Sequence, residues 1–347
     1  MLDPQVMPER LERFLAREDA SLAAARVVDY NPLAGGYSRL MASFTIEHKG
    51  ERSRYVLRGD PPPGQGLLVS DRRDEWNLLR ALESASNAPA PRARWFDAEG
   101  TELGTPALVI DWLEGRSLVE SLHGVSDDSV LGAATDKLAD VIAAVHATDP
   151  QALPAHLRSS VTWEQYVDGR VAILETLDDS LAGSDPLLRY LRVQLGRHRP
   201  PPVPLTLIHG DFQIPNVIVG TDETWSLVDW ERARVGDPRE DIGTWRLAAA
   251  ATPPDLVGRD ELRFCARYRE RTGLSESAFN PATIAFFTVL GTIDGYRDML
   301  AKIEAYGRGD IDGMMSAYLP NILTLMRTTY YAAARRLTAA DSNGASR

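Results

Sequence analysis

The sequence predicts an α+β fold with two lobes, a small lobe built on an antiparallel sheet and a large, mostly helical lobe. Two patterns carry this prediction. Between residues 25 and 111, short segments that alternate apolar and polar residues are separated by turn residues, which is typical of antiparallel strands. After Gly115, apolar residues recur mostly at helical spacing. A chain of 347 residues is long enough for one large domain or two modest ones.

The small lobe is predicted to span residues 1–111 and to begin with a helix, in which Leu11, Phe14 and Leu15 share one face. Three antiparallel strands should follow, with a helix after the third and two further strands behind that helix. The expected ranges are 26–28, 40–47 and 54–57 for the first strands, 71–82 for the helix, and 92–96 and 106–111 for the last strands.

The large lobe, residues 112–340, is expected to follow a connector at 111–115. It should begin with two helices and, after a proline-rich break at 199–204, continue with three short strands. The expected ranges are 133–146 and 163–177 for the helices and 205–208, 217–219 and 225–228 for the strands. From Pro238 onward the pattern is helical, and the small polar residues 341–347 should form a flexible tail.

Composition and charge disfavour several classes of function. The 49 acidic and 38 basic residues give a net charge of -11, whereas nucleic-acid binders normally present a basic surface. No run approaches the roughly 18 apolar residues that span a bilayer, and the charged N-terminus lacks the apolar segment of a secretory signal. Cys265 is the single cysteine, and its helical setting favours an inert, half-buried thiol. We expect a cytoplasmic monomer or homodimer with no nucleic-acid or membrane partner.

Polar residues gather at the ends of two neighbouring predicted strands. Asp211 lies in the loop directly after the strand 205–208, Asn216 stands at the other end of that loop, and Asp229 ends the strand 225–228. Magnesium prefers such oxygen ligands, often one or two carboxylates together with substrate phosphates. A further carboxylate can orient the hydroxyl that attacks a phosphate. The combination therefore predicts phosphoryl transfer.

Three motifs occur in order around these residues. They are His209-Gly210-Asp211 with Asn216, Val228-Asp229-Trp230, and Gly236-Asp237-Pro238 with Asp241. Together they resemble the aminoglycoside phosphotransferase and choline kinase-like superfamily, which has a protein-kinase-like two-lobed fold, and the resemblance extends over about residues 33–331. It implies that Asp211 is the catalytic base or orients the hydroxyl, while Asn216 and Asp229 hold Mg²⁺. We expect His209, Asp237 and Asp241 to be structural.

The same resemblance implies that residues 1–111 bind ATP or GTP, while residues 112–340 carry the catalytic and acceptor-binding groups. A turn containing Gly35, Gly36 and Ser38 should cover the phosphates, because glycine lets backbone N–H groups approach closely. Taken alone, a Gly-Gly pair is also an ordinary hairpin turn. Main-chain groups near Ile110 and Trp112 should contact the base.

Arg58 occupies the third-strand position where the family usually has a lysine that reaches the phosphates. The chain has few alternatives, because its lysines are Lys49, Lys137 and Lys302, and none of them is suitably placed. Arginine binds phosphate well, although the two cations are not interchangeable. We expect Glu75, on the following helix, to pair with Arg58, with Asp71 and Asp74 as rivals and a solvated acidic face as the alternative.

The sequence thus predicts a Mg-ATP-dependent kinase that phosphorylates a hydroxyl of a small molecule, as aminoglycoside phosphotransferases do. A hydroxyacyl-CoA or an amino alcohol is an alternative acceptor, because Arg58 and the following Pro61-Pro62-Pro63 resemble a branch associated with acyl-CoA dehydrogenases. An alternative of another class is a catalytically weak pseudokinase, which Arg58 favours and the intact Asp211, Asn216 and Asp229 disfavour. A two-metal phosphoesterase is disfavoured, because the other histidines have no matching partners around them.

The acceptor pocket is expected in the large lobe near Asp211, with one wall from a helix at 286–296. Its candidate lining residues are Trp163, Tyr166, Asp294, Arg297 and Asp298, although packing or a solvated helix face is the more common role for each. An acidic pocket would suit a polycationic aminoglycoside. Arginines near the pocket would instead suit a carboxylate or phosphorylated acceptor.

Overall fold

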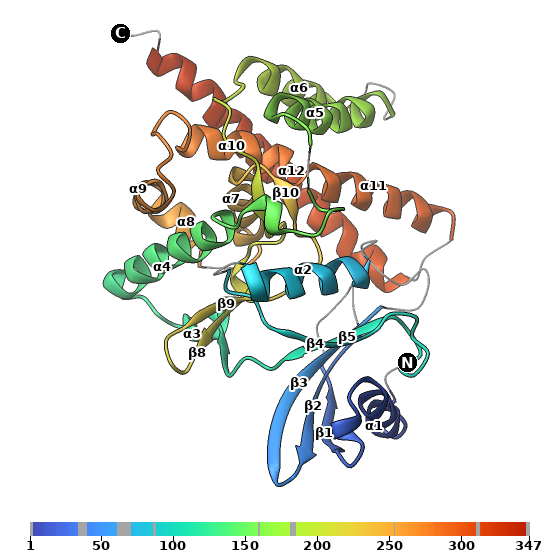
Figure 1. The fold of residues 1–347 in the computed structure, drawn as a ribbon. Helices are drawn as coiled ribbons and strands as arrows, with labels where there is room; N and C mark the ends of the chain where they lie inside the picture. The colour runs from blue at the N-terminus through green and yellow to red at the C-terminus, as the bar shows by residue number, and fades with distance from the viewer. Residues whose placement is uncertain are drawn as a thin grey trace.

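The computed structural model describes residues 3–33, 40–60, 71–85, 88–158, 160–180, 185–252, 254–309 and 313–344. A small lobe with a five-stranded antiparallel sheet lies at one end of the molecule, and helices make up most of the other end (Figure 1). The predicted α+β, two-lobed fold is therefore confirmed. Within the described residues, no helix is both long and apolar enough to cross a membrane.

Every element predicted for the small lobe is present. They are α1 (Met7–Glu18), β1 (Arg26–Pro32), β2 (Leu40–His48), β3 (Glu51–Gly59), α2 (Arg72–Ala85), β4 (Ala93–Asp97) and β5 (Ala107–Asp111). The short η1 (Ala20–Leu22) follows α1 and was not predicted. The strands follow the order β1-β2-β3-β5-β4. Helix α2 lies between this sheet and the large lobe in Figure 1.

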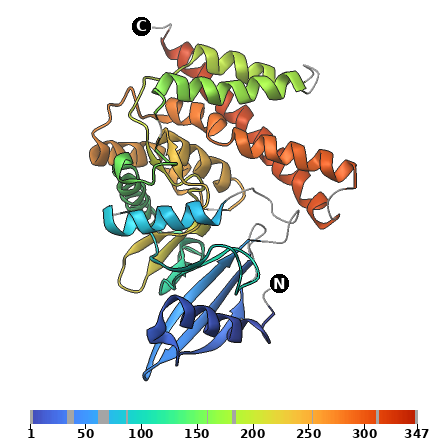
Figure 2. The ribbon, with the colours of Figure 1, turned by 45° about the vertical axis from the view of Figure 1, so that its right-hand side comes forward.

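The two faces of the sheet have different partners, because side chains alternate along each strand. Helix α1 lies against the outer face (Figure 2). There Leu57 and Val109 pack with the buried stripe of α1, which includes Leu11 and Phe14. On the inner face, Val56 of β3 packs with α2 and the large lobe. Alternation puts Arg58 on this inner face, two residues after Val56 and opposite Leu108 of β5.

The large lobe contains the predicted helices and strands together with several elements that the sequence analysis did not resolve. It comprises β6 (Gly115–Ser117), α3 (Leu118–Ser121), α4 (Asp128–His146), η2 (Pro150–Ala152), α5 (Trp163–Ser180), α6 (Pro186–Arg197), β7 (Thr206–Ile208), η3 (Ile214–Asn216), β8 (Val217–Gly220), β9 (Trp225–Leu227), β10 (Arg234–Gly236), α7 (Arg239–Ala249), α8 (Leu256–Arg259), α9 (Glu261–Thr272), α10 (Pro281–Leu290), α11 (Ile293–Gly307) and α12 (Gly313–Gly344). The unpredicted β10 pairs with β7, and the unpredicted β6 pairs with β8.

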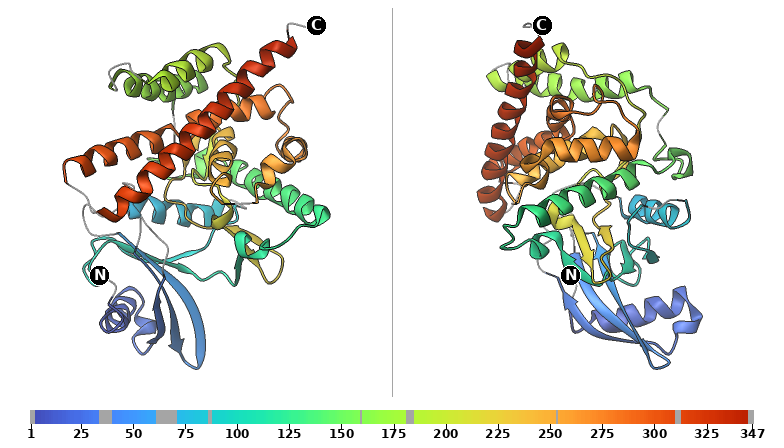
Figure 3. Two further views of the ribbon diagram at one scale, coloured as in Figure 1. Left: turned by 180° about the vertical axis from the view of Figure 1, so that it is seen from behind. Right: turned by 90° about the vertical axis from the view of Figure 1, so that its left-hand side faces the viewer.

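The helix predicted at 286–296 is wrong in one respect, because the chain breaks there into α10 and α11. Gly291 lies at the break, where an added Cβ would approach the Phe287 carbonyl oxygen to 2.8 Å and the Glu240 Cβ to 3.0 Å. Close packing against α7, which carries Glu240, thus accompanies the end of α10. At the C-terminus, α12 runs diagonally across the back of the large lobe (Figure 3) and continues to Gly344, so residues 341–344 of the predicted tail are helical.

One apolar cluster joins the two lobes. It includes Val56 and Ile110 from the sheet, Leu79 from α2, and Phe212 and Trp230 from the large lobe. A second cluster holds α5, α6 and α10–α12 together. The polar motifs of the sequence therefore lie in loops fixed on a core that both lobes share.

Candidate functional site

The loop after β7 is held by a buried carboxylate of α7. The backbone N–H groups of His209 and Gly210 donate to the two oxygens of Asp241, at 2.8 and 2.7 Å. His146 of α4 contacts the same carboxylate through Nε2 at 3.0 Å. Gly210 has φ 78°, and a Cβ there would lie 2.3 Å from the Arg232 carbonyl oxygen, so only glycine fits. These contacts fix the backbone from which Asp211 projects.

His209 joins this loop to the loop after β9. Its Nε2–H donates to the Val228 carbonyl oxygen at 3.0 Å, and its Nδ1 accepts the Asp211 N–H at 3.3 Å. The ring also packs edge-on against Trp230, with centroids 4.7 Å apart. Both ring nitrogens are therefore used in structural hydrogen bonds, in agreement with the predicted structural role.

Asp211 is oriented by two side-chain amides. Its Oδ2 accepts hydrogen bonds from Asn216 Nδ2 at 2.8 Å and Gln213 Nε2 at 2.9 Å. Burial and the negative charge of Asp229 raise the pKa of Asp211, while the positive charge of Arg232 and the Gln213 hydrogen bond oppose the shift. Asp211 is thus a fixed carboxylate that accepts a proton more readily than an ordinary aspartate.

Asp229 adopts a left-handed backbone conformation with φ 71°, which aspartate tolerates better than most residues. Its Oδ1 accepts from Arg58 Nη2 at 2.6 Å, and its side chain remains 32% exposed. The Val228 N–H donates to the Asn216 carbonyl oxygen at 2.9 Å, which ties the two loops together. The structure therefore brings Asp211, Asn216 and Asp229 into one site and connects that site to the small lobe.

Arg58 is the centre of a buried charge network between the lobes. Besides Asp229, its Nη2 lies 3.2 Å from Glu75 Oε1 and 3.9 Å from Glu231 Oε2. Arg58 is only 2% exposed, and burial alone would lower its pKa, but Glu75 and Asp229 raise the pKa of Arg58 above its usual value. The structure thus contains the predicted contact between Arg58 and Glu75.

Arg72 of α2 extends the network on the far side of Glu75. It pairs with Glu75, lies 3.1 Å from Glu231 Oε2, and its Nε lies 3.0 Å from Asp60 Oδ1. Two arginines thus share four carboxylates, those of Asp60, Glu75, Asp229 and Glu231.

The donor atoms around Asp229 suit magnesium. Asn216 uses Nδ2 to donate to Asp211, at 2.9 Å to the backbone oxygen and 2.8 Å to Oδ2, which leaves Asn216 Oδ1 as an acceptor. Within the described residues there is no group of three or more His, Cys, Asp or Glu side chains arranged to hold a metal. One carboxylate and one amide oxygen are nevertheless the small protein contribution that a magnesium ion bound mainly by phosphates requires.

The other residues predicted to contact the nucleotide lie in different surroundings. Gly35, Gly36 and Ser38 lie outside the described residues. Ile110 is buried in β5, opposite Val56 and Ala93. The N–H of Trp112 donates to the Arg54 carbonyl oxygen at 3.2 Å, and its ring lies 3.6 Å from the Arg54 guanidinium carbon. The Trp112 N–H is therefore already engaged within the small lobe.

A pocket of about 190 Å³ opens beside Asp211. Its wall comes from the loop after β7, Arg232, α7, α11 and α12, and from α11 it includes Gly295 and Met299. The five candidate lining residues of the acceptor pocket are absent from the wall of this pocket. Those residues are Trp163, Tyr166, Asp294, Arg297 and Asp298.

The physical reason is the rotation of the helices about their axes. Residues 295 and 299 of α11 are four apart and share the face towards the pocket. Asp294 lies on another face and pairs with Arg170 of α5. In α5 itself, Trp163 Nε1 donates to Asp237 at 2.7 Å and Tyr166 donates to Glu240 at 2.8 Å.

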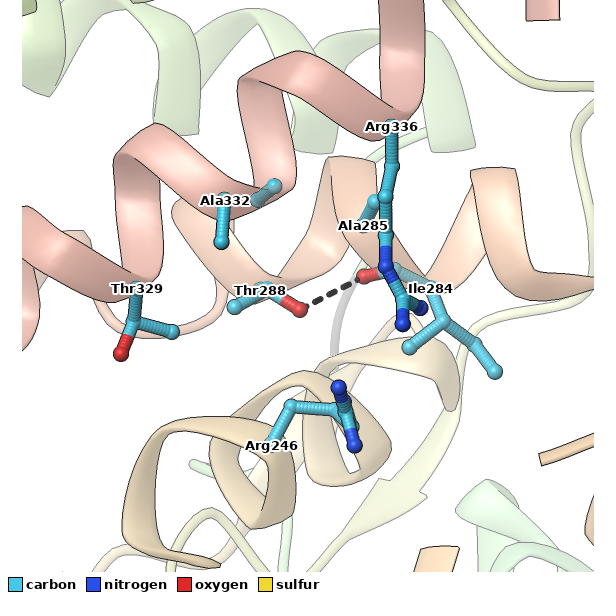
Figure 4. Close-up of a pocket in the computed structure, with 8 residues that line it drawn as sticks. Arg246, Ile284, Ala285, Thr288, Thr329, Ala332 and Arg336 are labelled. Atoms are coloured by element: carbon cyan, nitrogen blue, oxygen red, sulfur yellow. Dashed lines mark hydrogen bonds between the residues drawn. The ribbon is translucent and has the colours of Figure 1, made fainter. Parts of the chain in front are cut away.

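A much smaller cavity, of about 40 Å³, lies between α7, α10 and α12 (Figure 4). Arg246 and Arg336 reach into it from α7 and α12, and each pairs with a carboxylate, Asp255 and Glu261 respectively. This volume holds about one water molecule, so the cavity belongs to the helical packing and not to a substrate site.

Sequence reasoning missed Arg72, Glu231 and Arg232 as parts of the site. Glu231 and Arg232 follow Asp229-Trp230 directly, so proximity to the motif was an available signal. Arg72 had none, because an arginine at the start of a predicted helix is ordinarily a solvated residue. The tether made by Asp241 was anticipated only as a capping or structural role.

Comparison with known proteins places these features in a family. Residues 29–279 match the profile of the phosphotransferase enzyme family. Acyl-CoA dehydrogenase family member 11 of Gallus gallus is 30% identical over 219 residues, which cover 58% of this chain and 26% of that protein. The chain thus spans about a quarter of the length of this curated relative.

Solved structures share the fold at low sequence identity. A Ralstonia eutropha protein provisionally assigned as an aminoglycoside phosphotransferase has a TM-score of 0.67 at 17% identity, covering 95% of this chain and 98% of that one. An aminoglycoside phosphotransferase bound to ADP and hygromycin B has a TM-score of 0.61 at 17% identity, with 94% and 98% covered. For a choline kinase of Streptococcus pneumoniae the values are 0.56 and 17%, with 95% and 99% covered.

Proposed function

This chain belongs to the phosphotransferase enzyme family, and on that premise we propose that it transfers the γ-phosphate of ATP to a hydroxyl of a small molecule. The observation that carries the proposal is the joint placement of Asp211, Asn216 and Asp229, with Asp229 in contact with Arg58 of the small lobe. GTP is the alternative donor.

Arg58 is the proposed ligand of the nucleotide phosphates. Its Nε is buried and has no hydrogen-bond partner among the described residues, so it is a donor that a phosphate oxygen would satisfy. Asp229 and Asn216 are the proposed ligands of Mg²⁺, which would neutralise the charge that develops on the phosphate oxygens. For the nucleotide base, the N–H of Trp112 is already used in a hydrogen bond to Arg54. The next main-chain donor of the connector is the N–H of Leu113.

Asp211 is the proposed base. Its hydrogen bonds from Gln213 and Asn216 hold one oxygen, and the other is available to accept the proton of the attacking hydroxyl. Its raised pKa improves its capacity to take that proton. The pocket beside Asp211 would position the acceptor for in-line attack, so that most of the rate enhancement comes from positioning and electrostatics.

A pseudokinase is the second candidate, and one observation favours it. Arg58 replaces the usual lysine and is surrounded by three carboxylates, which a nucleotide would have to share. Against it stand the ordered Asp211 and the amide contacts that orient this side chain.

The test is ATP consumption with aminoglycosides, macrolides, choline-like alcohols and hydroxyacyl-CoAs, compared between the wild type and Asp211→Ala. We expect Asp211→Ala to bind Mg-ATP with nearly unchanged affinity in calorimetry and to lose transfer by at least about 100-fold. Substantial remaining turnover would contradict the role of Asp211. Mg-ATP binding without consumption for any acceptor would favour the pseudokinase.

Asp229→Ala should weaken Mg-ATP binding, and an unchanged metal-dependent affinity would count against its metal role.

A further inference from the structure

We propose that the pocket beside Asp211 selects an acceptor with a short apolar chain and an anionic end group, and that Arg232 binds this anion. The inference rests on the proposed function, because it names the acceptor class for the same transfer. It separates this protein from kinases of polycationic acceptors.

The wall of the pocket is mainly apolar. Its apolar side chains are Leu247 and Ala248 of α7, Met299 of α11, and Ile322 and Met326 of α12, while Gln213, Thr244 and Thr292 add uncharged polar side chains. Among the described residues that line the pocket, Asp211 and Arg232 are the only charged ones. Because Asp211 is assigned to the reacting hydroxyl, Arg232 is the one charged group left in the wall to recognise the rest of the acceptor.

Arg232 differs from the other arginines around the site. Arg58, Arg170, Arg234 and Arg239 each pair with a carboxylate. The guanidinium of Arg232 forms no hydrogen bond or ion pair with any described residue, although the side chain is half-buried. A partly desolvated guanidinium favours a carboxylate or phosphate, which it can bind through two parallel hydrogen bonds.

A polycation does not fit this wall. Two of the acidic residues that would favour it, Asp294 and Asp298, lie elsewhere, and Asp294 is neutralised by Arg170. A cationic group in the pocket would meet the positive charge of Arg232, with Asp211 as the only lining carboxylate. We assign the anion to the acceptor and not to the nucleotide, because the pocket is built from large-lobe residues, whereas Arg58 lies on β3 of the small lobe.

The pocket has room for a short chain beside Asp211. A volume of about 190 Å³ corresponds to roughly six groups of the size of a water molecule, at ~30 Å³ each. Gly295 faces open space, because a Cβ added there meets no atom within 4 Å. A chain of about six carbons therefore matches the space available, and a larger side chain at position 295 would remove that space.

Binding of three matched probes tests the inference without requiring turnover. Calorimetry should show that hexanoate binds the wild type at least about tenfold more tightly than hexanol or hexyltrimethylammonium. Arg232→Gln should abolish this preference, whereas Arg335→Gln should retain it, because Arg335 lies exposed on α12 away from the pocket. Equal binding of hexanol or of the cation to the wild type would overturn the proposal, as would an unchanged hexanoate affinity in Arg232→Gln.

A second variant locates the probe. Gly295→Leu should fold normally, since the new side chain points into open space, and should lose hexanoate binding while keeping its affinity for Mg-ATP. Hexanoate binding that survives Gly295→Leu would overturn the assignment to this pocket. Competition between hexanoate and Mg-ATP would overturn it as well, because Arg232 would then belong to the nucleotide site.

Turnover distinguishes this inference from the proposed function. With ATP, the wild type should release ADP in the presence of 6-hydroxyhexanoate and much less with its methyl ester, and Arg232→Gln should raise the KM for the acid by about tenfold with a smaller change in kcat. Comparable turnover of acid and ester would overturn the proposal. Selective hexanoate binding without any ADP release would support the pocket assignment and count against the kinase function.

Discussion

Two aspartates of the site show how surroundings separate the roles of identical side chains. Burial raises the pKa of Asp211, and the nearby charge of Asp229 adds to the shift. Burial would also raise the pKa of Asp241, but the hydrogen bonds from His146 and from backbone N–H groups outweigh it and lower the pKa overall. Asp211 is therefore suited to take a proton, whereas Asp241 keeps a fixed negative charge.

Gln213 provides a test of this assignment at the residue scale. Its hydrogen bond to Asp211 stabilises the carboxylate and lowers the pKa, so Gln213→Ala should raise that pKa further. Because the base must be deprotonated, the acid limb of the pH profile of kcat/KM should move to higher pH. Gln151→Ala, on the exposed η2 turn, is the matched control and should leave the profile in place. An acid limb that stays fixed or moves to lower pH in Gln213→Ala would refute Asp211 as the titrating group.

At the scale of elements, the sequence predicted the strands and helices more successfully than their contacts. The strands β1 to β5 were predicted because alternation and turn residues are local signals. The strands β6 and β10 were not, because neither has an apolar run and each becomes a strand only by pairing with β8 or β7. Helical spacing predicted α5, but it could not show which neighbours each side of α5 would contact, because that depends on tertiary packing.

The same distinction applies to the candidate site. Asp211, Asn216 and Asp229 could be predicted to converge, because each occupies the end of a strand or loop. Arg72 and Glu231 could not, because their burial follows from the docking of α2 against the large lobe. The pairing of Arg58 with Glu75 was predictable only through the family resemblance, since no local pattern joins β3 to α2.

The tether between α7 and the loop after β7 leads to a prediction. In Asp241→Asn, one oxygen that accepts a backbone N–H is replaced by an amide donor, so we expect a loss of about 1–3 kcal/mol of stability. Loosening of the loop should lower kcat by at least about tenfold, with little change in the KM for ATP. Asp127→Asn is the control, because Asp127 also accepts two backbone N–H groups but at the exposed start of α4, where asparagine caps equally well.

Calorimetry at several pH values checks the charge on Asp241. The pKa of Asp241 is lower in the folded protein than in the unfolded chain, where it is about 3.9. Its stabilising contribution is therefore present above the unfolded pKa and is lost as the pH falls through the folded pKa. The stability difference between the wild type and Asp241→Asn should therefore shrink below about pH 4. If Asp241→Asn destabilises no more than Asp127→Asn at neutral pH, the tether is not what fixes the loop.

Arg58 links β3, α2 and the loop after β9, so its substitution tests the coupling of these elements. Arg58→Met should leave Glu75 and Asp229 without their shared cation and cost about 3–5 kcal/mol of stability. Arg58→Lys should lower the stability less than Arg58→Met. It should also weaken Mg-ATP binding, because a lysine cannot place separate nitrogen atoms against the carboxylates and the phosphate as a guanidinium can. Arg52→Lys, in an exposed pair on the same strand, should change both quantities little. Tighter nucleotide binding in Arg58→Lys would mean that the arginine is a mark of reduced activity and not a phosphate ligand.

At the scale of the whole molecule, the lobes share both an apolar cluster and a charge network. Val56 and Ile110 of the sheet belong to the same buried cluster as Phe212 and Trp230 of the large lobe. Arg58 and Glu231 add an ionic contact across the same boundary. The small lobe has a complete core on its α1 side only, since its inner face is covered by α2 and by the other lobe.

This arrangement predicts that the two lobes unfold together. Calorimetry of the full chain should give one transition, which Mg-ATP shifts to higher temperature because the ligand binds only the folded form. Residues 1–111 expressed alone should lack a cooperative transition, because separation exposes Val56 and Ile110 and leaves Arg58 without Asp229 and Glu231. Two resolved transitions in the full chain, or a cooperative transition in the isolated lobe, would show that the lobes are independent domains. In that case Arg58→Met should lower only the transition temperature of the small lobe. If the lobes share one core, Arg58→Met should instead lower the temperature of the single transition of the whole chain.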